Sequence, residues 1–447
     1  MTHGLIFKAA HIIQHPRFLK IYNALIRNQK RDFKYLKNDQ ERNLSLMVRY
    51  CYEHIPYYHY LFKHYGIDPT KIRRICDLSD IPILTKKLIR KYYQYFQPYN
   101  IKIKHTTRST GGTTGTPLSY RIDNDNRFLG AALLYRGWSY AGYSLGDKLV
   151  HLGGRSINIK QGFDYHKIVD EKMRNMKKLS SFNMSNTTLG HYIRVINKFK
   201  PKFIRGYSSA LFVLANYCSN SISKVHSPKA IFTTSEKLYP HMRKKIESVF
   251  ESKVFDGYGL NDGCLSAFEC VEKVGMHINT ERSIHEIVSD DGQIETGHGS
   301  IIATSLFNYS MPFLRYHTGD YGTVSNETCP CGRKYKLLTD VDGRSVDILY
   351  TPSGERVHGW VFLYLFWEFG ENIIEYQVVQ NKLEEIDVYL ITDDNFNTDI
   401  IRNIEKTVYS QYPLWRLIFH FPSKIPKSIS GKYRFIKNNL EMSEVIN

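Results

Sequence analysis

Long hydrophobic runs are missing from this sequence. Its apolar stretches are broken by Lys, Arg, Asp or Asn, so none is long enough to cross a bilayer as a helix. The first residues also lack the pattern of a secretory signal peptide. These absences exclude a conventional membrane-spanning or exported protein, and we expect a cytoplasmic enzyme.

Cysteine is scarce and odd in number. The seven cysteines are irregularly spaced in a chain without an export signal, which argues against a disulfide framework. Two of them lie together in the sequence Cys329-Pro330-Cys331-Gly332. This pair needs an explanation other than a disulfide network.

Acidic residues are outnumbered by basic ones. The chain has 61 Lys and Arg against 43 Asp and Glu, a net charge of +18, and much of the excess lies before residue 110. Such a charge suits phosphate-rich ligands, nucleic acid or an anionic membrane face, although Lys-rich solvated surfaces give the same balance. Tyr and Phe are scattered, and no RNP, zinc-finger or helix-turn-helix pattern accompanies them. Nucleic acid is therefore the less favoured partner.

One stretch has almost no side chain that could be buried in a core. Residues 109–117 read Ser-Thr-Gly-Gly-Thr-Thr-Gly-Thr-Pro. Glycines let the backbone N–H groups approach an anion closely, and the hydroxyls add further donors, so the stretch is typical of a phosphate-binding loop. No Gly-Lys-Ser/Thr follows, which excludes a Walker A loop. A flexible Gly/Thr turn is the other interpretation.

The order of patterns along the chain predicts two domains. At 447 residues one small core is excluded. Residues 5–96 have helical periodicity and are divided by four prolines into short helices. Strand and helix patterns then alternate, which predicts a mainly parallel sheet with helices on both faces. The expected strands are 118–122, 149–152, 203–207 and 230–234, and the expected helices are 128–140, 189–199 and 209–217.

Later segments predict a site and a second domain. A strand ends near Phe255, and the turn that follows it, residues 256–262, lies where ligands bind open parallel sheets. Residues 284–288 and 300–306 predict a smaller sheet, while the polar segment 315–322 is typical of a site loop. Beyond residue 342 the pattern changes to an α+β unit with strands 374–379 and 386–392 and a helix 398–409. We therefore expect domains 1–342, with helices over 1–100, and 343–447.

Five motifs occur in one order over most of the chain. They are the Gly/Thr loop, Tyr-Gly-Leu-Asn-Asp at 258–262, Arg-Tyr-His-Thr-Gly-Asp at 315–320, Gly-Arg-x-x-Asp at 343–347 and Ser-Gly-Lys at 430–432. As a set they resemble the core motifs of the adenylate-forming (acyl-adenylate synthetase) superfamily. Residues 52–58, 81–86 and 205–210 further resemble its phenylacetate-CoA ligase branch, and specifically CapK-type members associated with bacterial polysaccharide gene clusters.

The resemblance implies a fold and a reaction. The fold is α/β, with a large N-terminal adenylate-forming domain rich in parallel sheets and helices and a small mobile α+β C-terminal domain. The reaction converts a carboxylic acid and ATP into an acyl-adenylate and pyrophosphate, with Mg²⁺, and then transfers the acyl group to a thiol, amine or hydroxyl. The acceptor would be CoA or a glycan precursor.

The resemblance also implies roles for single residues. The ATP phosphates would be held by Ser109, Thr110, Gly111, Gly112, Thr113, Thr114, Gly115 and Thr116, with Thr114 in the catalytic set. The adenosine part would contact Ser235, Glu236, Tyr258, Gly259, Asp320 and Arg344, where Tyr258 stacks on adenine and Asp320 binds the ribose hydroxyls. The catalytic residues would be Lys432, which stabilises charge on the α-phosphate, and Asp262; the hinge would be Asp347.

Some of these residues have plain structural alternatives. Tyr258 could be a core residue, Asp320 a turn or cap residue, and Lys432 a surface lysine. Asp262 stands where the family usually has Glu, as a Mg²⁺ ligand. Because Asp is one methylene shorter, the metal geometry shifts or a water intervenes.

A second group of residues suggests zinc. The set Cys270, His277, Cys329 and Cys331 offers three sulfurs and one nitrogen, which zinc accepts in closed tetrahedral sites. The Cys-x-Cys-Gly sequence after the Thr-Gly-Asp motif resembles a zinc-binding feature of phenylacetate-CoA ligase relatives. Cys264 is an alternative ligand, and four unconnected side chains are the structural alternative.

A hypothesis of another class also remains. The chain could be a catalytically inactive basic protein that keeps the fold and binds nucleic acid or an anionic membrane. Within the enzyme hypothesis, the N-terminal lysines could dock the protein to a membrane that carries a lipid-linked glycan.

Overall fold

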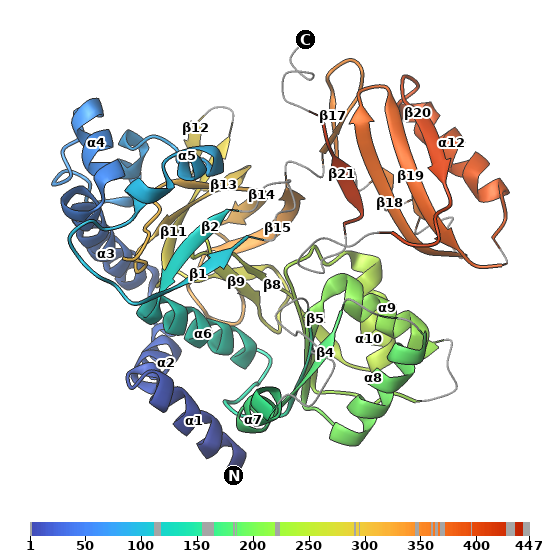
Figure 1. Ribbon diagram of the computed structural model, residues 1–447, viewed down its shortest axis with the longest axis horizontal. Helices are drawn as coiled ribbons and strands as arrows, with labels where there is room; N and C mark the ends of the chain where they lie inside the picture. Colours follow the sequence, from blue (N-terminus) through green and yellow to red (C-terminus); the bar gives the residue numbers. More distant parts are fainter. Residues whose placement is uncertain are drawn as a thin grey trace. The chain divides into compact units, whose positions relative to one another are not determined.

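The chain forms two compact units in a computed structural model, Met1–Asp342 and Gly343–Asn447, both drawn in Figure 1. The structure describes residues 2–110, 118–153, 165–181, 184, 186–219, 224–289, 292–294, 296–344, 348–358, 361–362, 365–366, 372–394, 396–425 and 434–440.

The N-terminal part is helical, as its periodicity predicts. Asp32 ends the preceding turn and caps a long helix by accepting a hydrogen bond of 2.7 Å from the Tyr35 amide. Pro56 starts the next helix, and Gly66, at φ +64°, ends it. The elements are α1 (Thr2–Gln14), α2 (Phe18–Asn28), α3 (Phe33–His54), α4 (Pro56–Tyr65), η1 (Ile75–Asp80), α5 (Lys86–Lys91) and η2 (Tyr93–Phe96).

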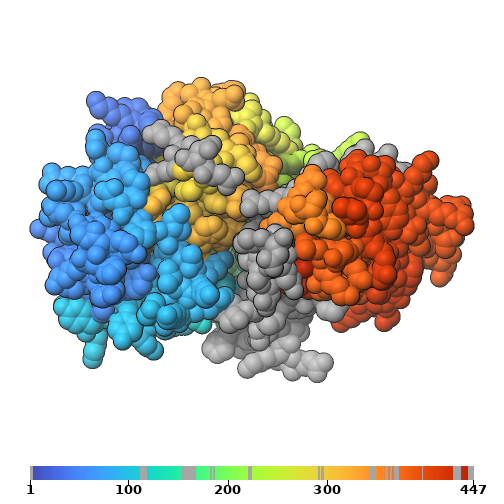
Figure 2. Space-filling model, turned by 90° about the horizontal axis from the view of Figure 1, so that it is seen from above, coloured from blue at the N-terminus to red at the C-terminus, as the bar shows by residue number. Residues whose placement is uncertain are grey.

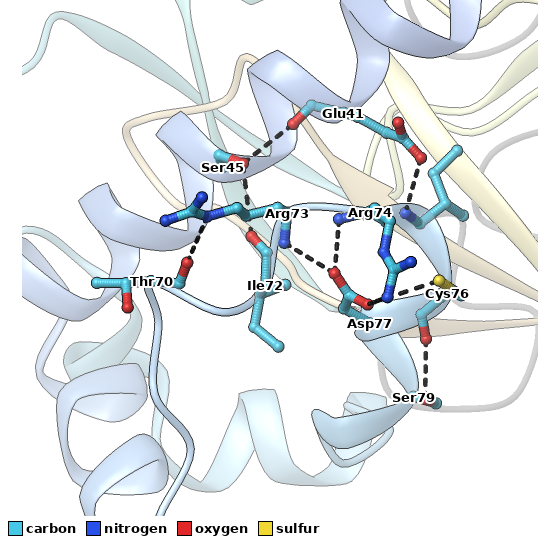
Figure 3. Close-up of polar contacts among 10 residues, drawn as sticks. Glu41, Ser45, Thr70, Ile72, Arg73, Arg74, Cys76, Asp77 and Ser79 are labelled. Atoms are coloured by element: carbon cyan, nitrogen blue, oxygen red, sulfur yellow. Dashed lines mark hydrogen bonds and ion pairs between the residues drawn. The ribbon is translucent and has the colours of Figure 1, made fainter.

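The segment between α4 and α5 is held in place by one carboxylate, as Figure 3 shows. Asp77 accepts hydrogen bonds from the backbone amides of Arg73 and Arg74, at 3.1 and 2.8 Å, and from the Arg74 side chain. The Arg74 amide is the main reason why the pKa of Asp77 falls to about 2. Ser45 of α3 donates to the Ile72 carbonyl at 3.5 Å. These bonds fix the chain on α3 before it turns towards α5.

A five-stranded parallel sheet forms the second layer, as the sequence predicts. Figure 1 shows α6 and α7 beside one face of its strands and α8, α9 and α10 beside the other. The strand order is β4-β3-β5-β6-β7. The strands are β3 (Leu149–Gly153), β4 (Met176–Ser180), β5 (Phe203–Tyr207), β6 (Ala230–Thr234) and β7 (Lys253–Phe255), and the helices are α6 (Asn124–Ser139), α7 (Tyr165–Met173), α8 (Asn186–Phe199), α9 (Ser208–Ser219) and α10 (Pro240–Phe250).

The largest sheet is antiparallel, and the sequence underestimated it. Its order is β12-β11-β13-β14-β15-β10-β9-β8. It contains the expected strands at 284–288 and 300–306. A smaller sheet was expected there, whereas the observed sheet has eight strands. They are β8 (Gly257–Gly259), β9 (Ser266–Glu269), β10 (Met276–Ile278), β11 (Ser283–Ser289), β12 (Gly292–Ile294), β13 (Gly297–Ser305), β14 (Tyr316–Ser325) and β15 (Leu337–Arg344).

The prediction that residues 315–322 form a loop is wrong. From residue 316 onwards they are part of β14, whose side chains alternate between buried and half-buried positions. Thr318 and Asp320 occupy buried positions where strands usually carry apolar residues. The period of two was therefore present, but hydrophobicity did not follow it.

Helix α6 connects the two sheets. Trp138 stacks on Phe232 of the parallel sheet, with ring centroids 5.2 Å apart. On the same helix Arg136 is fully buried and forms an ion pair with Glu281, which lies between β10 and β11. Tyr335 accepts from Arg136 at 2.8 Å and donates to Glu281 at 2.9 Å. The two terminal nitrogens of Arg136, the Glu281 carboxylate and the Tyr335 hydroxyl bind one another, so the buried charges hold α6 against the antiparallel sheet.

The second unit is a small α+β domain, as predicted. Its four-stranded sheet has the order β20-β19-β18-β21, and a two-stranded sheet precedes it. The elements are β16 (Ile348–Tyr350), β17 (Arg356–His358), β18 (Ile373–Lys382), β19 (Glu385–Thr392), α12 (Asp399–Gln411), β20 (Arg416–His420) and β21 (Ile436–Asn438). Across the described residues of both units, no helix has the length and hydropathy needed to span a membrane.

Candidate active site

The Gly/Thr loop lies at the end of a two-stranded ribbon. Strands β1 (His105–Ser109) and β2 (Ser119–Asp123) are antiparallel, and Ser109 is opposite Ser119. Two hydrogen bonds of 2.9 Å close the base of the loop: the Thr110 amide donates to the Leu118 carbonyl, and the Leu118 amide donates to Thr110 Oγ1. The predicted loop residues that lie outside the described part of the chain are Gly111, Gly112, Thr113, Thr114, Gly115 and Thr116.

Two tyrosines and two aspartates join the second and third motifs. Tyr258, on β8, donates to Asp320 Oδ2 at 2.8 Å, and Tyr316, which starts β14, donates to Asp262 Oδ2 at 2.7 Å. Each motif thus supplies one donor and one acceptor, and we call this set the crossed Tyr–Asp pairs. Both carboxylates are buried. The two motifs are brought to one place although 54 to 62 residues separate the partners.

The β14 end of the crossed Tyr–Asp pairs is held by residues 84–86. Leu84 forms a parallel bridge with Tyr316, and its carbonyl accepts from the His317 amide at 2.9 Å. Lys86 donates to the Thr318 carbonyl at 2.9 Å. Gly319 follows at φ +85°, a conformation that few other residues adopt. The stretch that resembled the phenylacetate-CoA ligase branch therefore positions the strand that carries Asp320.

The ribbon also approaches Asp262. Tyr120, on β2, is buried in the same apolar cluster as Leu84 and Tyr316. Burial raises the pKa of Tyr120, and the charge of Asp262 is the next cause. The strand that leaves the Gly/Thr loop is therefore a neighbour of the Asp262 carboxylate.

The end of β6 supplies the remaining described residues. Ser235 has a left-handed backbone at φ +69°. Glu236 Oε2 accepts from the Ser209 amide at 2.9 Å, so its carboxylate caps the start of α9. On the neighbouring strand end, Asp256 accepts from Thr233 Oγ1 at 2.6 Å. Burial, followed by the charge of Glu269, raises the pKa of Asp256 to about 6.

Three predicted residues belong to the boundary and the second unit. Arg344 is the last residue of β15, and its side chain lies outside the described part of the chain. Asp347 and Lys432 lie outside the described residues altogether.

The four Cys and His residues lie together. Their ligand atoms are all within 4.8 Å of one another. Cys270 and Cys329 are separated by 3.5 Å between sulfurs, and Cys331 Sγ lies 3.3 Å from His277 Nε2. A tetrahedral zinc separates its sulfur and nitrogen ligands by roughly 3.5–3.8 Å, so the donor set and spacing fit this ion. The alternative ligand Cys264 is elsewhere, where it accepts from Asn126 at 3.2 Å.

Sequence reasoning missed two kinds of residue. Tyr316 was quoted as part of a motif, but its hydrogen bond to Asp262 had no sequence signal. Lys86 was quoted only as a mark of the ligase branch. Arg136 and Glu281, which fix α6 beside the site, could have been noticed only as charged residues within apolar segments.

Comparisons with known proteins agree with this arrangement. Residues 349–439 match a family model described as the CapK C-terminal domain. The chain is 28% identical over 442 residues to a protein named CapK from Staphylococcus aureus. This alignment covers 96% of this chain and 95% of that protein. It is 25% identical to a phenylacetate-coenzyme A ligase of Thermus thermophilus, over 87% of this chain and 89% of the ligase.

A solved structure has the same fold. It is a 2-hydroxyisobutyryl-CoA ligase in the postadenylation state, with a TM-score of 0.73 over 92% of this chain and 91% of that one, at 17% identity. The fold is thus that of the adenylate-forming CoA ligases. The sequence relatives point the same way, because the chain is similar over most of its length to CapK and to phenylacetate-CoA ligases. Family, fold and the class of AMP-forming ligases agree with the expectations from the sequence.

The crossed Tyr–Asp pairs make a stability prediction. Replacing Tyr316 with Phe removes one hydrogen bond from the buried Asp262 carboxylate, so we expect the free energy of unfolding to fall by about 1–2 kcal/mol. Tyr321→Phe, on the same strand, is the matched control and should change it by less than about 0.5 kcal/mol. Urea denaturation measures both, and equal effects of the two variants would contradict the role of the pair.

Proposed function

We propose that this chain activates a carboxylic acid with ATP and then transfers the acyl group to an acceptor. The main support is the crossed Tyr–Asp pairs, because they bring together the two motifs to which the superfamily resemblance assigns adenine, ribose and Mg²⁺ binding. In the first step a carboxylate oxygen attacks the α-phosphorus, and the bond to pyrophosphate breaks. In the second step the acceptor attacks the acyl carbon, loses its proton, and releases AMP.

Described residues would bind and orient ATP in this scheme. Tyr258 lies beside Asp320 through their hydrogen bond, so a base stacked on the tyrosine would leave its ribose close to the aspartate. Ser109 and Thr110 stand at the fixed base of the loop whose amides and hydroxyls would hold the phosphates. Ser235 and Glu236, at the end of β6, would meet the adenine edge.

Asp262 is the residue that would hold Mg²⁺. Its Oδ2 accepts from Tyr316, and among the described residues no hydrogen bond is made to its other oxygen. One oriented carboxylate oxygen suits a hard cation that keeps several waters. A bound Mg²⁺ would neutralise charge on the phosphates.

The remaining roles follow the family resemblance. Lys432 would stabilise the charge shared by the α-phosphate and the carboxylate. Arg344 would bind ATP, and Asp347 would be the hinge of a mobile second unit. The acceptor would be CoA or a sugar amine or hydroxyl, and a role in polysaccharide biosynthesis rests on the likeness to CapK alone.

Pyrophosphate release tests the reaction. With ATP, Mg²⁺ and a panel of aryl, short-chain and amino acids, we expect release that depends on one class of acid. Lys432→Ala should lower kcat by roughly 100-fold or more, since it removes a charge that stabilises the transition state. The control is Lys406→Ala, an exposed lysine of α12 in the same unit, which should leave kcat unchanged.

The same assay distinguishes an adenylating enzyme from the alternative, a protein that only binds nucleic acid or membrane. A protein that only binds nucleic acid or membrane would release no pyrophosphate with any acid. Its binding would also tolerate Lys432→Ala and Asp320→Asn. Where acid-dependent release is found, AMP formation with CoA or with a nucleotide-linked amino sugar then identifies the acceptor.

Zinc is proposed for the cysteine and histidine cluster. The ion would join the turn at Cys329 to the hairpin of β9 and β10, next to the α6 network, and its role would be structural. We expect one zinc per chain by elemental analysis. Cys329→Ser should remove it and lower Tm by about 5–10 °C. The control is Cys76→Ser, at an exposed cysteine. If the wild-type protein contains no zinc after incubation with the ion, the site is ruled out.

Helix α1 supports a peripheral association with an anionic membrane. Phe7 and His11 pack inwards on each other and on Tyr135, while the opposite face is apolar and open to solvent. On that face Leu5, Ile6 and Ile13 are 67%, 46% and 83% exposed. Residues 1–31 contain six Lys or Arg and no Asp or Glu. An apolar helix face with basic surroundings suits the interface of an anionic bilayer.

Vesicle sedimentation tests this association. Wild-type protein should sediment with phosphatidylglycerol vesicles, less so at high salt and not with phosphatidylcholine alone. Ile6→Ser with Ile13→Ser should reduce the bound fraction at least about fivefold, because two apolar groups are lost. Leu46→Ser, an exposed leucine of α3, is the control. A concentration-dependent dimer that these serines abolish, without vesicle binding, would show that a second copy covers the face instead.

A further inference from the structure

The parallel sheet carries an unusual cationic row on the face that packs against α6. Near the start of β3 and β5, Leu149 and Phe203 face the apolar core beneath α6. Two residues further on the same face stand His151 and Arg205, paired in register across the two strands. Lys178 of β4 is paired with His151 on the other side. Three basic side chains therefore lie next to one another, at the middle of strands β4, β3 and β5.

In the part of the chain that the structure describes, Arg205 has no counter-charge. Its guanidinium lies 5.3 Å from the centroid of Trp138, and its Nε is buried without a hydrogen-bond partner. Among the described residues, no hydrogen bond and no ion pair involves this side chain. Burial lowers the pKa of Arg205, although Arg remains charged at neutral pH. A largely buried guanidinium without a carboxylate is costly and has an empty donor fork.

The neighbouring groups do not compensate this charge. Lys178 is paired with Asp170 at 2.6 Å, and the same carboxylate holds Arg174 at 2.7 Å. His151 is kept neutral, because burial and then the charges of Arg205 and Lys178 lower its pKa to about 3. The Asp170 carboxylate thus already holds two cations, and Arg205 is not one of them. The surplus positive charge is on Arg205.

Arg205 lies one strand away from the end of β6, where the adenine edge would bind. Its partner on β6 is Phe232, and β6 ends two residues later at Thr234, about 6–7 Å further along the strand. That edge is where the acyl-adenylate would form. Gly153 follows His151 on β3, and a Cβ at Gly153 would lie 2.7 Å from His151 Nε2. Only a residue without a side chain fits beside the His151 ring at this position.

We propose that Arg205, with His151 beside it, binds a second anionic group at the far end of the acid substrate. The substrate is then an acid with a short carbon chain between the carboxylate that is activated and a second carboxylate or a phosphate. The guanidinium fork binds this group in a bidentate manner, and the neutral imidazole donates one further hydrogen bond. This inference rests on the proposed adenylating function, whose acid it specifies.

The experiment compares acids that differ only at the far end. The probes are linear dicarboxylic acids from malonate to adipate, phosphonocarboxylic acids of similar length, and the monocarboxylic acids of the same lengths. Pyrophosphate release gives kcat/KM for each, and thermal shift with each acid gives a readout that needs no turnover. The variants are Arg205→Met and, as control, Arg194→Met, an exposed arginine of α8.

We expect a clear preference in the wild type that depends on Arg205. A doubly anionic acid should exceed its monoanionic counterpart at least about 10-fold in kcat/KM. Arg205→Met should lower the value for that acid roughly 30-fold or more and remove the preference, since it leaves a buried anion unpaired. Because the variant removes an uncompensated charge, the Tm of the free protein should stay the same or rise. Arg194→Met should behave as wild type.

Other outcomes overturn the inference. Monocarboxylic acids that react as well as their doubly anionic counterparts, with Arg205→Met unchanged, would show adenylation without this subsite. A fall in Tm in Arg205→Met with an unchanged acid preference would show that the arginine only supports the fold. Absence of pyrophosphate release with every acid counts against the proposed function. In that case the subsite is rejected if no doubly anionic acid raises Tm, or if the shift is the same in Arg205→Met.

Discussion

The candidate site depends on two hydrogen bonds that cross between segments far apart in the chain. Tyr258 binds Asp320, and Tyr316 binds Asp262. If the segments were displaced by one residue, every side chain on β14 would turn to the opposite face and both bonds would be lost. Register is therefore essential here, and it is fixed from outside the sheet, because Leu84 pairs with Tyr316. The N-terminal helices contribute to the site by holding this register.

Helix α6 serves as a structural link between the two halves of the first unit. It packs on the parallel sheet by aromatic stacking and on the antiparallel sheet by a buried ion pair. Stacking tolerates small displacements, whereas the Arg136 network accepts only one geometry. The relative position of the two sheets is therefore set by hydrogen bonds. The cationic row of the parallel sheet lies against Trp138 of this same helix.

The sequence predicted the class of fold better than the position of the site. Alternating strands and helices with apolar cores, such as β5 and α9, carry a periodic signal, and these were predicted. Strand β14 was missed because its buried positions hold Thr318, Asp320 and Gly322, whose polarity or size hides the period. Tyr316 was missed for a different reason: a tyrosine shows its partner only after the sheet has formed. The cysteines and His277 were grouped by ligand chemistry, which does not depend on the fold.

Two requirements act on the sequence of the Gly/Thr loop: the hairpin of β1 and β2 must close, and the loop would have to fit a ligand. The closed base of the loop assigns them to different residues. Thr110 supplies both its amide and its hydroxyl to Leu118, so the ribbon is closed before the first glycine of the loop. Both bonds join residues that flank the loop. Natural selection can then change the composition and length of the loop to suit its ligand, while β1 and β2 keep their pairing. Thr110 is constrained by the hairpin itself, because a side chain without a hydroxyl would leave the Leu118 amide without this partner.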